Sequence, residues 1–211
     1  MSMNKTSIDW PWKPLYTWNP VVGCKRGCPY CYARKMNTRY GWLKDFAELK
    51  FYPERLKQPP EKVENVFVGS MTDIDYWRIE WVQRVMAWCR MNRAIDFYFL
   101  SKNPCPYLEY RPDNCFIGLT MTLQEDFAGQ YEKINKFGFN KSRFLSLEPL
   151  LGTLKLDRTF FTGYHAIIVG AMTGPGAVKP KREWIDSIKA LNLDNVYWKN
   201  NIGGNGKGGQ G

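Results

Sequence analysis

Short apolar runs alternate with amphipathic stretches along most of this chain, and this alternation limits the possible folds more than any other feature. Six runs rich in β-branched and aromatic residues predict strands, at 65–70, 96–101, 114–120, 143–148, 165–171 and 195–199. Three stretches carry apolar residues three or four positions apart and predict helices, at 76–91, 123–138 and 181–192. Several strands are almost continuously apolar, which is typical of a parallel sheet covered by helices.

The expected fold class is therefore α/β. With a further strand predicted at 16–22, the chain would form a partial (β/α) barrel of about six to seven mostly parallel strands, or else an open doubly wound sheet. In both architectures the loops after the carboxyl ends of the strands carry the chemistry. We expect one domain over residues 1–199, which begins with an aromatic-rich segment at 1–19. Residues 200–211, of which six are glycine, are expected to form a flexible tail.

The charge balance favours an anionic partner. Thirty Lys and Arg residues against twenty Asp and Glu give a net charge of +10, a surface field that attracts polyanions or phosphorylated substrates. No apolar run approaches the ~18 residues that are needed to cross a bilayer, and the N-terminus shows no signal-peptide pattern. We therefore expect a cytoplasmic protein with no membrane partner.

Three of the six cysteines lie within eight residues. Cys24, Cys28 and Cys31 have the spacing C-x3-C-x2-C, in the loop between the first predicted strand and a helix expected to begin near Tyr32. Three thiolates leave one iron of a 4Fe-4S cluster without a protein ligand. A structural zinc site would need a fourth ligand, and three free thiols would be open to oxidation, but both alternatives stay open. The other cysteines, expected to be small buried hydrophobic residues, are Cys89, Cys105 and Cys115.

The cysteine motif, with Tyr30 directly before its last cysteine, resembles that of the radical S-adenosylmethionine (radical SAM) superfamily. More of the chain, including "VFVGSMTD", "SLEPLLG" and "IIVGAMTGPGA", resembles a three-cysteine family of phages and bacteria within that superfamily. The resemblance implies that Cys24, Cys28 and Cys31 bind a 4Fe-4S cluster whose open iron chelates S-adenosylmethionine. It also implies one-electron cleavage of that cofactor to a 5'-deoxyadenosyl radical, hydrogen abstraction from a substrate, and an electron donor such as flavodoxin or ferredoxin.

The same resemblance implies contacts to S-adenosylmethionine from loops that follow the predicted strands. Tyr30 would approach the adenine. Many members of the superfamily carry a Gly-Gly-Glu-like turn after the second strand, which binds the methionyl amine, and here Gly69, Ser70 and Asp73 occupy that turn. Thr120 follows a later strand and would hold a ribose hydroxyl, although a buried threonine often satisfies backbone groups instead.

Two charged residues at predicted strand ends are candidates for catalysis. Lys102 could meet the carboxylate of S-adenosylmethionine or a substrate phosphate, or it could be an ordinary solvated lysine. Glu148 follows an apolar strand, where burying an unpaired carboxylate would be costly. We therefore expect Glu148 to bind the cofactor or to take part in catalysis.

Aromatic and basic residues flank the cysteine loop in the sequence. They could form a stacking platform for a nucleic-acid base, or the aromatic residues could simply close one end of a barrel. The residues concerned are Trp10, Trp12, Lys13, Tyr16, Trp18, Lys25, Arg26, Arg34, Lys35, Arg39 and Lys44. We predict action on a nucleic-acid base or nucleotide, in modification or repair. The alternatives are the same chemistry on a small metabolite or peptide, and a non-enzymatic, metal-stabilised nucleic-acid-binding module.

Overall fold

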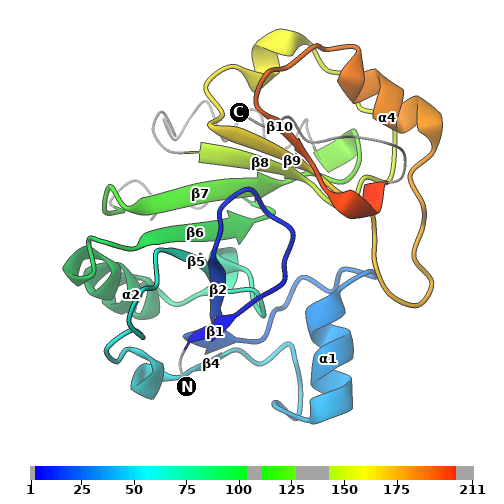
Figure 1. The fold of residues 1–211 in the computed structure, drawn as a ribbon. Helices are drawn as coiled ribbons and strands as arrows, with labels where there is room; N and C mark the ends of the chain where they lie inside the picture. The colour runs from blue at the N-terminus through cyan, green and yellow to red at the C-terminus, as the bar shows by residue number, and fades with distance from the viewer. Residues whose placement is uncertain (1–2, 104–110, 127–142, 203–211) are drawn as a thin grey trace. The chain divides into compact units, whose positions relative to one another are not determined.

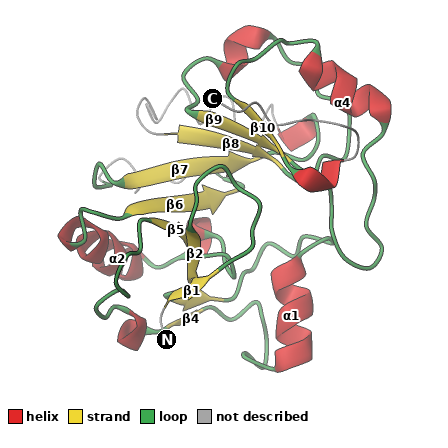
Figure 2. Ribbon diagram, viewed as in Figure 1, coloured by secondary structure: helices red, strands yellow, loops and turns green. Residues whose placement is uncertain are grey.

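The computed structural model describes residues 3–103, 111–126 and 143–202 (Figure 1). These residues form a mixed α/β structure with three α-helices and a mostly parallel sheet of eight strands (Figure 2). The chain divides into two compact units, the first comprising Met1–Ile8 and Trp12–Ile117 and the second Asp9–Pro11 and Gly118–Gly211. In the described part of the chain, no helix has the length and apolar character that a membrane span requires.

The hydrogen-bonded order of the large sheet is β1-β2-β5-β6-β7-β8-β9-β10. Its parallel pairs include β2 with β5, β5 with β6, β8 with β9 and β9 with β10, whereas β1 is antiparallel to β2. The strands are β1 (Met3–Lys5), β2 (Leu15–Trp18), β5 (Asn65–Val68), β6 (Asp96–Ser101), β7 (Cys115–Thr120), β8 (Arg143–Leu147), β9 (Ala166–Val169) and β10 (Val196–Trp198). The prediction of a mostly parallel α/β sheet is confirmed, and its closure into a barrel stays a prediction.

In the first unit, helix α2 (Ile79–Met91) packs on the sheet through large side chains. Trp88 of α2 contacts Trp18 of β2 and Phe97 of β6, with ring centroids 4.5 and 5.7 Å apart. The buried residues of α2 recur every three or four positions, as the sequence pattern predicts; they are Val82, Val85, Met86, Trp88 and Cys89. A second, two-stranded sheet pairs β3 (Val21–Val22) with β4 (Lys50–Phe51), and helix α1 (Tyr32–Tyr40) follows the cysteine loop.

In the second unit, helix α4 (Arg182–Lys189) supplies Ile185 and Ile188 to an apolar cluster that includes residues of β8 and β9. The short segment Asp9–Pro11 belongs to this unit although it comes from the N-terminus. Its Trp10 ring lies edge-on to Phe144 of β8, and the Asp9 carboxylate accepts a hydrogen bond from Tyr197 Oη at 2.6 Å. These contacts attach the segment to both β8 and β10.

Three features differ from the sequence predictions. The strand expected at 16–22 is split, because Asn19 and Pro20 separate β2 from β3 and β3 then pairs with β4 instead of joining the large sheet. Residues 200–202, expected in the tail, form a 3-10 turn in which Ile202 is buried and the Asn201 amide exchanges two hydrogen bonds with the Ala171 backbone. The predicted helix at 123–138 and the rest of the tail lie largely outside the described residues. The prediction of one domain over 1–199 stays a prediction.

Candidate functional site

The cysteine loop, residues 23–31, is tied at its beginning to the turn that follows β5. Gly23 N donates to Met71 O at 3.1 Å, and Cys24 N donates to Phe46 O at 2.7 Å. Gly23 has a φ of 105°, and an added Cβ would lie 2.9 Å from Glu48 O, so only glycine fits this position. The loop therefore begins in a fixed backbone position.

The end of the loop is fixed by helix α1. Cys31 is the N-cap residue, and its Sγ accepts a hydrogen bond from Arg34 N at 3.4 Å. The Arg34 guanidinium donates to Cys24 O at 3.1 Å, so this arginine contacts both the first and the last cysteine of the motif. The free N–H groups and the dipole at this helix N-terminus favour negative charge in the space beside Cys31.

The three thiols are half-buried, free, and close enough to influence one another's charge. Burial raises the pKa of Cys24 to about 11, with smaller contributions in the same direction from Asp73, Cys31 and Cys28. Burial likewise raises the pKa of Cys28, while the Lys102 ammonium acts in the opposite direction. Because these pKa values are raised, the Cys24 and Cys28 thiols would lose their protons only if a positively charged group bound beside them.

The two kinds of metal group considered for these thiols both stay open. Within the described ranges, no three His, Cys, Asp or Glu side chains are grouped to hold a metal ion. A 4Fe-4S cluster instead bonds each of its thiolates to a different iron, so its ligands need not converge on one atom. The three cysteines of this anchored loop match the number of thiolates that such a cluster with one open iron would take, and its binding stays a prediction.

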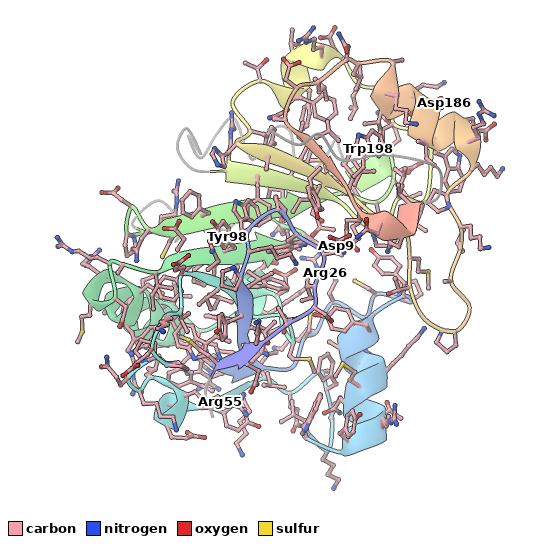
Figure 3. All side chains as sticks on the ribbon, viewed as in Figure 1. Asp9, Arg26, Arg55, Tyr98, Asp186 and Trp198 are labelled. Carbon is pink, nitrogen blue, oxygen red and sulfur yellow. The ribbon has the colours of Figure 1, made fainter. Side chains whose placement is uncertain are left out.

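Arg26, inside the loop and labelled in Figure 3, forms ion pairs with two carboxylates that follow β5. Its Nε lies 3.3 Å from Asp73 Oδ2, without hydrogen-bond geometry, and its Nη2 donates to Asp75 Oδ2 at 3.4 Å. The guanidinium also lies over the Tyr76 ring, 5.4 Å from its centroid. The sequence showed Arg26 only as one of several basic residues, whereas the structure makes it the link between the loop and the end of β5.

Asp73 extends this link to the end of β6. Its Oδ1 accepts from Ser101 Oγ at 2.6 Å, and its Oδ2 accepts from Lys102 N at 3.1 Å. The residue is only 6% exposed, so both oxygens are engaged inside the protein. Asn103 adds a bond from its Nδ2 to Asp75 Oδ1 at 2.9 Å. We predicted Asp73 as a cofactor contact, and the structure places it between the cysteine loop and the ends of two neighbouring strands.

The predicted Gly69–Ser70 turn lies directly beside this network. Gly69 has a φ of 76°, in the left-handed region that favours glycine, and Ser70 Oγ exchanges a hydrogen bond with the Asn19 side chain at 3.1 Å. Asn19 Oδ1 also accepts from Met71 N at 3.0 Å, and Tyr32 Oη donates to Ser70 O. Asn19 was not predicted, because its role depends on a contact with a turn about fifty residues further along the chain.

Lys102 and Tyr30, both predicted, meet at the loop. The Lys102 ammonium lies 5.2 Å from the centroid of the Tyr30 ring. They place one cation and one aromatic ring next to the thiols, and the Lys102 charge partly opposes the rise that burial causes in the pKa of Cys28. The first unit thus brings together the predicted cysteines, Tyr30, the Gly69–Ser70 turn, Asp73 and Lys102.

In the second unit, Glu148 forms an ion pair that the sequence did not reveal. Glu148 Oε1 accepts from Lys199 Nζ at 2.5 Å, and only 10% of the lysine side chain is exposed. The two residues follow β8 and β10, and Gly170 follows β9 between them. A Cβ on Gly170 would lie 2.7 Å from Lys199 Cδ and 2.8 Å from Glu148 Cδ, so the glycine leaves the space in which the pair forms.

Two hydroxyl groups lie at the same edge of the second unit. Thr120 is the last residue of β7 and is buried. Its predicted contact with a ribose hydroxyl stays a prediction. Ser146 lies in β8, two residues before Glu148. Among the described residues, its buried Oγ has no hydrogen-bond partner, which is unusual for a core hydroxyl.

The aromatic N-terminal segment is partly core. Trp10 and Trp18 are fully buried, so the predicted stacking platform is wrong for these two rings, whose apolar surface instead contributes to packing. Trp12 stacks on Tyr98 with centroids 4.0 Å apart. Cys89 and Cys115 are buried as predicted, and Cys105 lies outside the described residues.

The family model described as "Protein of unknown function (DUF5131)" matches residues 5–199. No match was found among curated proteins or among solved structures. The comparisons therefore supply no activity, substrate or cofactor.

Proposed function

The chain belongs to the family described as a protein of unknown function (DUF5131), and we propose that it is a radical SAM enzyme. In this proposal the three cysteines hold a 4Fe-4S cluster, S-adenosylmethionine is the second cofactor, and the substrate is a nucleic-acid base or nucleotide. The fold would be a partial (β/α) barrel, and an electron donor such as flavodoxin or ferredoxin would reduce the protein in the cytoplasm.

The observation that carries the proposal is the anchoring of the cysteine loop. Three half-buried thiols lie between a backbone position that only glycine fits and a helix N-terminus, and Arg26 fixes the middle of the loop to Asp73. A loop that binds no group could lie in solvent and would not require these buried polar contacts. Buried polar groups cost free energy unless they are fully paired. The arrangement supports a permanent group with positive charge and three thiolate ligands.

The chain's own residues would have distinct parts. When bound, the cluster supplies an electron and an open iron position, and S-adenosylmethionine supplies the adenosyl group that becomes reactive towards a C–H bond. Cys24, Cys28 and Cys31 would hold the cluster as thiolates. The Lys102 ammonium, over the Tyr30 ring, offers donors for a carboxylate or a phosphate. The Tyr30 ring offers an apolar surface for a base.

Glu148 and Lys199 would act in the second unit as one donor–acceptor pair. The Lys199 Nζ–H bond to Glu148 Oε1 uses one of the three ammonium protons and leaves the others able to donate to a ligand. Thr120 at the end of β7 and Ser146 in β8 add polar groups, and the Ser146 hydroxyl has no hydrogen-bond partner in the described part of the chain. A polar edge of this kind supports binding of cofactor or substrate after the strand ends.

The proposal is tested by cluster assembly in cysteine variants. We expect the protein, purified without oxygen and reconstituted with iron and sulfide, to be brown and to hold about four irons per chain. Replacing Cys24, Cys28 or Cys31 with Ala should abolish the colour and most of the bound iron. Cys89→Ala and Cys115→Ala are the controls, because these thiols are buried in the core and should not affect iron content.

The contrast between the two groups of variants decides the outcome. Equal iron loss in the Cys89 and Cys115 variants would show that iron binding depends on folding alone. A single tightly bound zinc ion with no colour would favour the structural-metal alternative.

A further inference from the structure

One face of the sheet in the second unit carries a buried hydroxyl group. Leu145 and Leu147 of β8 belong to the apolar cluster to which helix α4 contributes. Ser146 lies between them, so alternation along the strand turns its side chain to the opposite face. Ser146 is 1% exposed, and among the described residues its Oγ has no hydrogen-bond partner. A buried hydroxyl of this kind is rare and indicates that the face receives a polar group from a ligand.

The ion pair of Glu148 and Lys199 lies at the carboxyl end of the same face. Gly170, the residue after β9, still takes part in the sheet, since its N–H donates to the main chain of β8 at 3.2 Å. Because Val169 belongs to the apolar cluster, alternation turns Gly170 to the opposite face, that of Ser146. A Cβ on Gly170 would lie 2.8 Å from Glu148 Cδ and 2.7 Å from Lys199 Cδ, so the ion pair lies on this face as well.

Both members of the pair keep hydrogen-bonding capacity that the described residues do not use. Within the described ranges, Lys199 Nζ makes one hydrogen bond, to Glu148 Oε1 at 2.5 Å, although an ammonium group has three N–H donors. Glu148 Oε2 accepts no bond from the same part of the chain. The lysine and glutamate side chains are only 10% and 23% exposed. The pair therefore offers a ligand an acceptor oxygen beside N–H donors, largely away from solvent.

The charges of the pair favour a neutral ligand. A phosphate or carboxylate group that approaches Lys199 is repelled by Glu148, and a cation that approaches Glu148 is repelled by Lys199. A dipolar group avoids both penalties, because its N–H can face the carboxylate while its acceptor atom faces the ammonium. The ligand must therefore present a donor and an acceptor side by side.

This requirement distinguishes among neutral groups. An ordinary peptide group is trans, so its N–H and C=O point in opposite directions and cannot both reach one ion pair. The rings of thymine, uracil and guanine contain a lactam, in which an N–H and the adjacent C=O point the same way along the Watson–Crick edge. The carbonyl oxygen has two lone pairs for the spare N–H donors of Lys199, whereas the ring nitrogen at that place in adenine or cytosine has one.

We infer that the Glu148–Lys199 pair binds the lactam edge of an unpaired nucleobase, that of thymine, uracil or guanine. Glu148 Oε2 accepts the ring N–H, and Lys199 Nζ donates to the adjacent C=O. Ser146 precedes Glu148 by two residues, roughly 7 Å along an extended chain, so its hydroxyl lies within the span of a base. This inference rests on the proposed function and names its substrate class. The pair serves the substrate, since the adenine of S-adenosylmethionine has no lactam.

The test is saturation-transfer NMR of nucleosides with the full chain, because nucleosides have no phosphate for the net positive charge to attract. We expect thymidine and deoxyguanosine to bind, and S-adenosylhomocysteine not to displace thymidine. In N3-methylthymidine a methyl group replaces the ring N–H. This probe should bind at least about tenfold more weakly than thymidine, because it cannot donate to the carboxylate.

The double variant Glu148→Met, Lys199→Met should lose about 100-fold in thymidine affinity and stay folded, since apolar replacement of a buried ion pair is often neutral for stability. Ser146→Ala should weaken binding about fivefold without lowering the melting temperature, because its hydroxyl has no partner to lose among the described residues. The matched control is Arg182→Gln, Asp186→Asn, which removes the ion pair on α4 in the same unit and should leave binding unchanged. Circular dichroism melts check that every variant is folded.

Four results would overturn the inference. They are no binding of any nucleoside, equal losses in the double methionine variant and the α4 control, equal binding of thymidine and N3-methylthymidine, and tighter binding of deoxyadenosine, nicotinamide or inorganic phosphate than of thymidine.

A separate measurement distinguishes this inference from the proposed function. Cleavage of S-adenosylmethionine to 5'-deoxyadenosine depends on the cysteine loop, whereas nucleoside binding is measured without turnover. Cleavage without nucleoside binding would overturn the base site alone, and nucleoside binding without cleavage would overturn the enzyme alone.

Discussion

At the scale of single residues, Gly170 shows how one absent side chain can create a polar site. The register of β8, β9 and β10 pairs Leu147 with Val169 and Val169 with Trp198. Glu148, Gly170 and Lys199 are thus the next residues on three neighbouring strands. Because the middle one has no Cβ, the two outer side chains can meet across it.

Gly170→Ala should separate the ion pair. The new methyl group would lie within 3 Å of both Glu148 and Lys199, and the buried lysine has little room to move. We expect the free energy of unfolding to fall by about 1–3 kcal/mol, measured by urea denaturation. The matched control is Gly152→Ala, whose Cβ would lie 3.2 Å from a methyl group of the exposed Leu123 and should cost much less. Equal stability of the two variants would show that the space at Gly170 is not needed.

At the scale of secondary-structure elements, the cysteine loop is positioned by the ends of β5 and β6. Arg26 joins the loop to Asp73, and Asp73 joins Ser101 and the backbone of Lys102. Asp73 therefore positions the cysteine loop. Its replacement should lower the stability of the fold and disturb the arrangement of the three thiols.

Asp73→Asn should weaken this connection. The amide removes the charge opposite Arg26 and replaces an acceptor oxygen with a donor, so we expect the free energy of unfolding to fall by about 2–3 kcal/mol. Iron retained after reconstitution should fall as well. The control is Asp45→Asn, an exposed residue whose Oδ1 accepts from Ala47 N, and it should cost less than about 1 kcal/mol. If the two variants are equally stable and retain equal iron, Asp73 does not position the loop.

The sequence was sufficient to place most elements. The strands predicted at 96–101 and 114–120 agree with β6 and β7 within one residue, because each is a continuous apolar run with clear ends. The short strands β1 and β4 were missed, since two or three residues carry no detectable periodicity. Candidate residues were found where local sequence is informative, as for the cysteines and Glu148. The sequence did not show that Arg26 pairs with Asp73, Asn19 with Ser70 and Lys199 with Glu148. Each of these pairs joins residues about fifty positions apart in the chain.

At the scale of the whole molecule, each of the two units carries residues that the proposed enzyme would use. The first holds the anchored cysteine loop, and the second holds the Glu148–Lys199 pair. The net charge of +10 agrees with an anionic substrate. The central claim is that these residues support cleavage of S-adenosylmethionine.

The most direct test of this claim is anaerobic turnover of the reconstituted full chain with S-adenosylmethionine and a chemical reductant, with 5'-deoxyadenosine measured by mass spectrometry. We predict that 5'-deoxyadenosine forms, that Cys28→Ala abolishes it, and that an oligonucleotide or nucleotide raises its rate. With deuterated DNA, deuterium should appear in the product. A preparation that carries a full complement of cluster iron, yet forms no 5'-deoxyadenosine with or without DNA, would contradict the assignment.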